Sequence, residues 1–114
     1  MELNQYIEKG YVVLQPNGEL DASSSSLLDD KVKECIEDEN CYILIDCSKL
    51  KYISSAGLGI FLSHKDELDE LNGHISFFSL NESVKDVFEL LGMDEIFTLA
   101  DSMEDIQDLL NKQN

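Results

Sequence analysis

Arginine and tryptophan are absent from this chain of 114 residues, which sets only eight lysines against 24 acidic residues. The formal net charge is −16, so nucleic acid and anionic membrane surfaces should repel the protein. Without arginine it also lacks the side chain best suited to bidentate capture of phosphate. A direct DNA or nucleotide binder is therefore not expected. The acidity serves either solubility or attraction to a basic partner surface, and like-charge repulsion favours a monomer.

Long apolar runs are also missing. No stretch approaches the roughly 18 apolar residues that a membrane-spanning helix needs. The first five residues, Met-Glu-Leu-Asn-Gln, carry neither a basic start nor an apolar stretch, and so do not resemble a secretory signal. We expect a cytoplasmic protein that does not enter membranes.

Cysteine is sparse, and its spacing excludes two common uses. Cys35, Cys41 and Cys47 form no closely spaced pair, and an odd count argues against a disulfide framework. A zinc site would need closer pairs, or histidines nearer than His64 and His74. We therefore expect reduced thiols that pack as small apolar groups, with no metal site and no cofactor.

The first third of the chain reads as a hairpin followed by a helix. Residues 3–7 and 11–15 alternate like short strands joined around residues 9–10, and residues 16–18, Pro-Asn-Gly, are expected to break the pattern. The serine tract at residues 23–26 offers several N-cap residues. Behind it, one helix face carries Leu28, Val32, Cys35 and Ile36.

A buried strand is predicted next, because residues 42–45 are apolar without alternation and end in Asp46. A short loop then leads to a second helix, whose apolar positions are Leu58, Phe61, Leu62 and Leu68. Residues 71–73, Leu-Asn-Gly, are expected to end that helix with a C-cap glycine.

The last third repeats this alternation. Residues 75–78 read as a strand and residues 96–99 as a short final one. Between them a third helix, closed by Gly92, has the apolar face Val84, Val87, Phe88 and Leu91. Asp101 and Glu104 resemble a capping box that opens a final helix through Met103, Ile106 and Leu110. The chain thus predicts one α/β domain over residues 1–114, with a mostly parallel sheet, an antiparallel N-terminal edge hairpin and about four helices.

Residues 52–59, Tyr-Ile-Ser-Ser-Ala-Gly-Leu-Gly, are the most specific segment. Ser54 is a good N-cap, and Ile53 before it is spaced to pack on Leu58 as a hydrophobic staple. Ser55 is then the first helical residue, with its hydroxyl free to face solvent.

Gly57 and Gly59 lie in the first turns of the same helix, where each costs about 1 kcal/mol relative to alanine. A bare backbone there serves either tight packing of the helix on the sheet or the close approach of another chain. The spacing alone leaves both possibilities open.

Residues 18–21 (Gly-Glu-Leu-Asp), the apolar strand ending in Asp46, and residues 53–59 together resemble the STAS family of anti-sigma factor antagonists. The resemblance covers nearly the whole chain, in order. It implies that the unmodified protein binds an anti-sigma factor and so releases a sigma factor for transcription. It also implies that the anti-sigma factor is a serine kinase that phosphorylates Ser55, and that a serine phosphatase restores the active form.

The residues that the resemblance assigns to partner binding are Asp21, Asp46, Ser54, Ser55, Ala56, Gly57, Leu58 and Gly59, with both aspartates near the modified serine. Many family members carry Asp at the position of Ser54 and Ser or Thr at that of Ala56. The first change preserves the cap. It also removes a carboxylate beside the kinase target, and it makes Ser54 a second candidate for modification.

Two other functions compete with this one. A STAS domain can act without phosphorylation, as an adaptor subunit of, for example, a transporter complex. Alternatively, Asp21 and Asp46 could hold magnesium or form an acid–base pair. Two carboxylates without arginine or a glycine-rich phosphate loop make a poor catalytic site. His64 and His74 read as a helix-surface and a strand-start residue, so we do not expect an enzyme.

Overall fold

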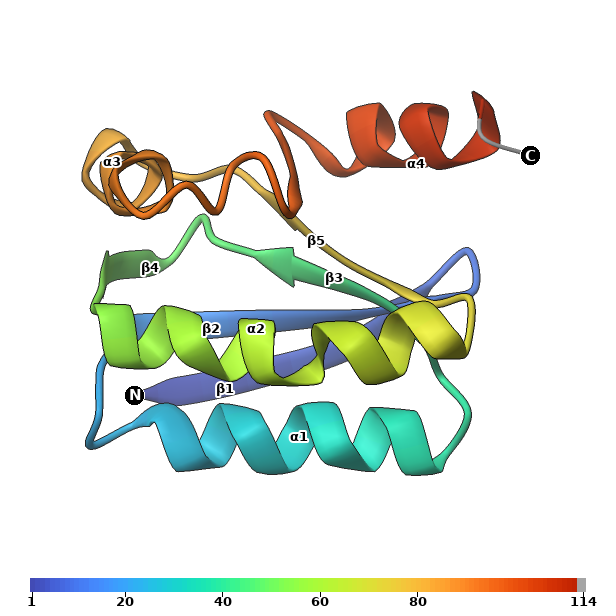
Figure 1. Cartoon of the computed structure of the whole chain (residues 1–114), viewed down its shortest axis with the longest axis horizontal. Helices are drawn as coiled ribbons and strands as arrows, with labels where there is room; N and C mark the ends of the chain where they lie inside the picture. The colour runs from blue at the N-terminus through green and yellow to red at the C-terminus, as the bar shows by residue number, and fades with distance from the viewer. Residues whose placement is uncertain (113–114) are drawn as a thin grey trace.

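A mixed β-sheet with helices on both faces forms the body of the protein (Figure 1). The computed structural model describes residues 1–112; the last two residues of the expected domain, 113–114, lie outside the described residues. Along the chain the elements are β1 (Glu2–Glu8), β2 (Tyr11–Leu20), α1 (Ser25–Glu37), β3 (Tyr42–Asp46), β4 (Leu50–Ile53), α2 (Ser55–Glu70), β5 (His74–Phe78), α3 (Glu82–Leu90), β6 (Thr98–Ala100) and α4 (Met103–Lys112).

The strand order confirms the expected α/β architecture. The sheet runs β1-β2-β3-β5-β6, and β4 also pairs with β2. Only β1 and β2 are antiparallel; the other pairings are parallel. In the β1–β2 turn Lys9 and Gly10 have φ values of 52° and 86°, the left-handed conformation of a tight hairpin. The described residues thus hold the predicted mostly parallel sheet, its N-terminal hairpin and four helices.

The prediction that residues 16–18 break the strand pattern was wrong, because β2 continues to Leu20. β3 pairs with β2 at residues 12–14, and β4 pairs with it from Gly18 onward. Pro16 lies between these two segments, so its missing N–H removes no bond to either strand. Gly18 has φ 115° at a register shift, which the glycine tolerates.

The short strand β4 lies in the segment between Asp46 and α2, for which the sequence predicts only a short loop. Its burial pattern explains the omission: Leu50 and Ile53 are buried while Lys51 and Tyr52 are exposed. A strand of four residues without alternation carries no period that sequence reasoning can detect. β4 extends the sheet beside the second half of β2 and leads directly into α2.

Two helix boundaries differ from their predictions in the capping residue. At the end of α2 the left-handed residue is Asn72, with φ 58°, and not Gly73. Gly73 is needed because a Cβ atom there would collide with the carbonyl oxygen of Cys41. At the start of α4, Ser102 accepts the hydrogen bond from Asp105 N at 3.2 Å, so the cap is Ser102 and the predicted Asp101 capping box was wrong.

The remaining helix predictions hold in outline. α1 begins within the serine tract, with Ser24 at the N-cap position but without a side-chain cap hydrogen bond. α3 buries Val84 and Phe88 before Gly92, whose φ is 72°. The last strand lies slightly later than predicted, over Thr98–Ala100, because Phe97 turns into the core. No helix in the described part of the chain is long and apolar enough to cross a membrane.

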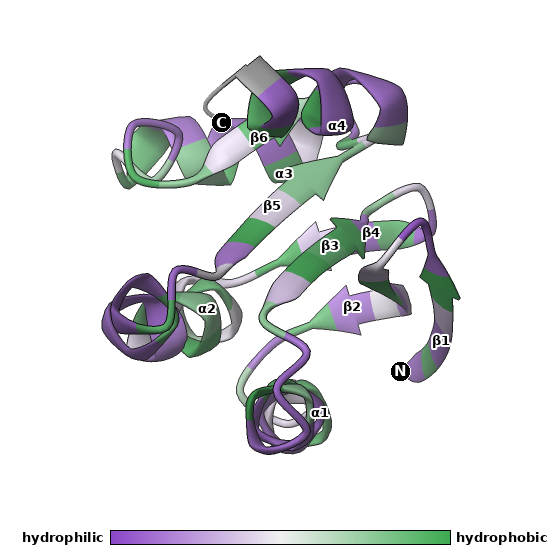
Figure 2. Ribbon diagram, turned by 90° about the vertical axis from the view of Figure 1, so that its right-hand side faces the viewer, coloured by the Kyte–Doolittle hydropathy of each residue, from purple (hydrophilic) through white to green (hydrophobic). Residues whose placement is uncertain are grey.

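The core is divided by the sheet. On one face the side chains of α1, α2 and α3 pack against the strands around Phe77, whose ring lies 4.8 Å from that of Phe61 and 4.9 Å from that of Phe88. On the other face α4 places Ile106 and Leu110 over Val13, Leu44 and Phe78. Figure 2 shows α1 and α2 on one side of the strands and α4 on the other. The side of the sheet that a residue faces therefore decides which helices it can contact.

The cysteines behave as apolar core groups. Cys35 and Cys47 are buried in the larger core, and Cys41 is half-buried at its edge. Burial raises the pKa of the Cys35 and Cys47 thiols, so both stay protonated at neutral pH. All three are free thiols, in agreement with the prediction.

Candidate functional site

The start of α2 is held in place by Ser54, which confirms that residue as the N-cap. Ser54 has an extended backbone, φ −94° and ψ 169°, and its hydroxyl accepts a hydrogen bond from Gly57 N at 3.1 Å. Its own N–H donates to Leu20 O at 2.9 Å, which ties the cap to the end of β2. Ile53 and Leu58, on either side, are both buried in the larger core, as the predicted hydrophobic staple requires.

Ser55 is the first residue of α2 and is exposed, as predicted. Because Ser54 already caps the helix, the Ser55 hydroxyl is left to solvent. Ala56 beside it is also exposed. The first N–H groups of a helix and its dipole favour negative charge at this end. A phosphoryl group on Ser55 would therefore meet a favourable field from its own helix.

The two glycines of this segment serve different purposes. Gly57 is buried, and a Cβ atom on it would lie 2.6 Å from Leu20 O and 2.9 Å from Leu20 Cγ. Its bare backbone is required for packing α2 on the end of β2. A Cβ atom on Gly59 would meet nothing within 4 Å. The structure thus assigns internal packing to Gly57 and leaves Gly59 open to the outside.

Asp21 follows β2 at the same end of the sheet as Ser55. Its carboxylate accepts hydrogen bonds from Ser23 N at 2.9 Å and from the Ser23 hydroxyl at 2.6 Å, and it also accepts one from Ser24 N at 3.2 Å. The hydrogen bond from the Ser23 hydroxyl is the main reason that the pKa of Asp21 lies below its ordinary value. Asp21 is therefore ionised at neutral pH, and it shapes the turn into α1 (Ser25–Glu37).

Asp46 is the last residue of β3, as predicted, but the expectation that it lies near Ser55 and contacts a partner does not fit its surroundings. It is only 7% exposed, and its carboxylate accepts from Gln15 Nε2 at 2.8 Å and from Ser48 N at 2.9 Å. It follows Leu44 by two residues, so it faces the α4 side of the sheet, whereas α2 packs on the opposite side.

Asp46 is also distant from Ser55 along the sheet. Its strand neighbour Ile45 pairs with Leu14, whereas Ile53 pairs with Leu20. The position on β2 level with Asp46 and the position level with the start of α2 are therefore about five residues apart, which corresponds to about 16 Å of extended strand. Asp21 and Asp46 are therefore too far apart to share a magnesium ion or to act as an acid–base pair.

Asp46→Asn is expected to lower the free energy of unfolding by about 1–3 kcal/mol. An amide can accept only through one oxygen, so its NH₂ group must face one of the two donors that the carboxylate now satisfies. Urea denaturation would measure the loss. Asp66→Asn, an exposed carboxylate on α2, is the matched control and should change stability little. Equal stability of the two variants would show that the hydrogen bonds of Asp46 do not stabilise the fold.

His64 is buried between helices, although its spacing was read as that of a surface residue. It is 8% exposed, and its Nε2 lies 2.6 Å from Asp29 Oδ1 of α1, while Lys33 Nζ lies 3.0 Å from Asp29 Oδ2. The hydrogen bond with His64, and then that with Lys33, lowers the pKa of Asp29. The spacing to the buried Phe61 and Leu68 was the signal that could have placed His64 on the inner face.

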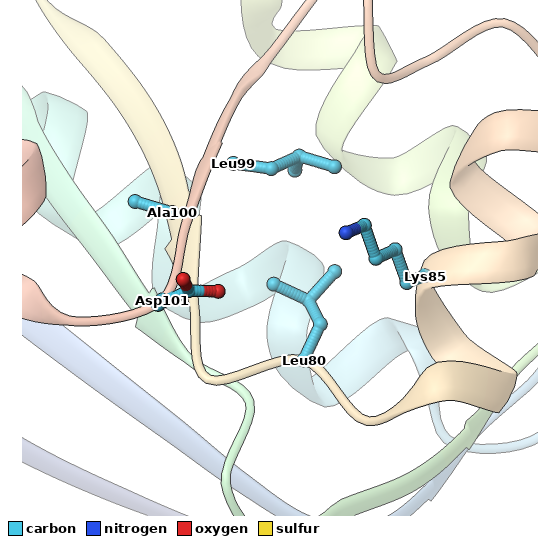
Figure 3. A pocket seen from close by; sticks show the side chains of 5 residues that line it. All are labelled: Leu80, Lys85, Leu99, Ala100 and Asp101. Atoms are coloured by element: carbon cyan, nitrogen blue, oxygen red, sulfur yellow. The ribbon is translucent and has the colours of Figure 1, made fainter.

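A small hollow lies past the carboxyl ends of β5 and β6, where α/β sheets often bind ligands. Its volume is about 70 Å³ and its lining is Leu80, Lys85, Leu99, Ala100 and Asp101. Figure 3 shows the Lys85 amine directed between the two leucines, with the Asp101 carboxylate across from them. Organic ligands usually need several hundred Å³, so this hollow is too small for a nucleotide.

Comparison with known proteins gives a consistent result. Residues 2–106 match the model of the STAS domain. The anti-sigma-B factor antagonist of Listeria monocytogenes is 30% identical over 83 residues, which cover 69% of each chain. An anti-sigma factor antagonist from Mycobacterium paratuberculosis superposes with a TM-score of 0.86 at 20% identity, over 96% of this chain and 93% of the other.

The anti-sigma factor antagonist SpoIIAA has the same fold in two states. Its unphosphorylated form superposes with a TM-score of 0.82 at 20% identity, over 97% of each chain. The phosphorylated form of the Bacillus protein gives a TM-score of 0.72 at 20% identity, over 96% of this chain and 99% of that one.

Proposed function

This chain belongs to the STAS domain family, and from that premise we propose that it is an anti-sigma factor antagonist controlled by phosphorylation of Ser55. The unphosphorylated protein, a single domain over residues 1–114, binds an anti-sigma factor that is also a serine kinase and thereby frees a sigma factor. Phosphorylation ends the binding, and a serine phosphatase restores it. The observation that carries the proposal is the exposed Ser55 hydroxyl on the first turn of α2, with the capping role taken by Ser54.

The named relatives support this proposal. The Listeria monocytogenes protein is named an anti-sigma-B factor antagonist, and SpoIIAA is an anti-sigma factor antagonist with structures in phosphorylated and unphosphorylated forms. The chain shares the fold of SpoIIAA in both forms, so modification is compatible with this architecture.

The switch follows from where the charge is added. A phosphoserine carries nearly two negative charges and several acceptor oxygens. In the free protein the N-terminus of α2 and surrounding water stabilise that charge. A partner that covers Ser55 would have to exclude the water and bury the phosphate close to the ionised Asp21. The fold therefore tolerates the modification, whereas the complex does not.

The segment divides into contact residues and residues that position them. Ser55, Ala56 and Gly59 are the accessible members, and with Asp21 they form the proposed contact surface. Ser54, Gly57 and Leu58 hold the start of α2 against β2 from inside. Asp46, buried on the other face of the sheet, contributes through stability of the fold and not through contact.

Phosphate mapping would test the proposal directly. The protein is incubated with its anti-sigma factor kinase and ATP, and the modified peptide is identified by mass spectrometry. One phosphate on Ser55 is expected, and none on the Ser55→Ala variant. Phosphate on Ser54 would move the site by one residue. A protein that binds its partner without accepting phosphate would favour the adaptor function instead.

The net charge of −16 predicts a salt-dependent association with the anti-sigma factor. Long-range attraction to a basic partner surface is screened over about 8 Å at physiological ionic strength. The association rate constant is therefore expected to fall about tenfold between low and physiological salt, with a smaller change in the dissociation rate. Stopped-flow mixing at several salt concentrations would measure both. A rate that salt leaves unchanged would limit the acidity to a role in solubility.

A further inference from the structure

The end of the domain opposite Ser55 carries a groove between the C-terminal ends of α1 and α2. Two adjoining hollows of about 490 and 580 Å³ make up this groove, and both are lined by Ile36, Glu37 and Leu71. In Figure 1 α1 and α2 run side by side in the same direction, and Figure 2 looks onto the ends where they stop. The groove is therefore separated from Ser55 by the length of α2, about 24 Å for its 16 residues.

The floor of the groove is apolar. Leu71 is 50% exposed and Tyr42 is 45% exposed, and the half-buried Ile36 and Cys41 line the same hollow. Exposing large apolar side chains to water is unfavourable in free energy, and covering them with another surface recovers that free energy. The floor offers a place for one or two apolar side chains.

The rim of the groove is acidic, and the one lysine among the described residues that line it, Lys33, already pairs with Asp29. Its exposed carboxylates are Glu37, Glu39, Glu67 and Glu70. The lysines of α1 and α2 pair with other acids, Lys31 with Glu34, Lys33 with Asp29 and Lys65 with Asp69. Four carboxylates against one paired lysine leave the rim with a net negative charge around an apolar floor.

This arrangement is unfavourable for the isolated domain. Neither α1 nor α2 has a basic residue in its last turn, although the negative end of the helix dipole favours cations there. Glu37 and Glu70 instead add negative charge at those ends. The width between the helices is held by the buried contact of His64 with Asp29, so the groove is a defined shape.

We propose that this groove binds a basic amphipathic helix of a partner protein. An apolar residue of that helix packs on Ile36 and Leu71, and its lysines or arginines meet the rim carboxylates, as in other helix-in-groove complexes. The surface lies at the opposite end of α2 from Ser55, so the phosphate does not reach it. A partner held there stays attached while the contact at Ser55 opens and closes.

A synthetic peptide of leucine and lysine, with the leucines on one helical face, is a suitable probe. Titrated into the ¹⁵N-labelled chain of 114 residues, it should shift the amide resonances around Ile36, Cys41 and Leu71 most strongly. A scrambled peptide of equal composition should bind more weakly, because its leucines do not share a face. The Ser55→Asp variant should bind the probe as tightly as the native protein.

Two double variants that each remove two negative charges distinguish binding in the groove from general attraction of the basic peptide to the acidic protein. Glu37→Gln with Glu70→Gln should weaken binding of the probe about fivefold, whereas Asp30→Asn with Asp66→Asn, on the same helices, should change it less than about twofold. Leu71→Gln should also weaken it. Equal losses for both double variants, or shifts spread evenly over the helices, would overturn the proposal. A dimer that Leu71→Gln dissociates would assign the groove to a second copy of this chain.

Discussion

Ser55→Asp is expected to stay folded and to bind the anti-sigma factor about a hundredfold more weakly than the native protein. The carboxylate lies on the first turn of α2, where the helix dipole stabilises it by about 0.3–1 kcal/mol. In the proposed complex the same charge would lose its water at the end of the sheet that also carries the ionised Asp21. Stability is therefore kept while affinity is lost.

Ser55→Ala is the matched variant for the opposite state. It removes a hydroxyl that does not cap the helix, so stability should change by less than about 1 kcal/mol and binding by only a few-fold. It cannot accept phosphate, so the partner should remain bound when ATP is added. Calorimetric titration and thermal melts of both variants would measure affinity and stability together.

Ser63→Asp controls for charge alone, because Ser63 is an exposed residue further along α2. It adds the same charge to the same helix and should leave binding within a few-fold of the native value. If Ser55→Asp binds as tightly as Ser63→Asp, then Ser55 is not at the interface. Loss of folding in Ser55→Asp would likewise contradict the assignment.

Gly57→Ala and Gly59→Ala are expected to shift stability in opposite directions. A methyl group on Gly57 meets Leu20 O at 2.6 Å, so α2 must move away from β2 at a cost of about 1–3 kcal/mol. Gly59→Ala meets nothing and replaces glycine with the best helix former, which should stabilise the protein by about 0.5–1 kcal/mol. Urea denaturation of the two variants would give both values.

The affinity of Gly59→Ala for the anti-sigma factor would test whether Gly59 is a glycine because the partner contacts the helix there. If the partner approaches the bare backbone of α2 beside Ser55, Gly59→Ala should weaken binding even though the domain is more stable. Unchanged affinity would restrict the contact surface to Asp21, Ser55 and Ala56. Gly57→Ala that is as stable as the native protein would show that the helix can move without cost.

Local patterns in the sequence determined much of this protein. Alternation of strand and helix segments predicted the α/β fold, and the Lys9-Gly10 turn and the N-cap at Ser54 were confirmed because each depends on neighbouring residues alone. The exposed position of Ser55 followed from the same cap. The formal net charge of −16 likewise follows from composition alone.

Contacts between distant residues were decided only by the tertiary structure. Asp46 is buried because Gln15, 31 positions away, satisfies its carboxylate, and His64 is buried because Asp29, 35 positions away, faces it. β4 exists because the second half of β2 offers it an edge, and Gly57 faces Leu20 only once α2 lies on that edge. A polar residue or a short segment has the same local propensity with or without such a partner. Whether it is buried or paired in a strand is therefore decided by packing between elements that are distant in sequence.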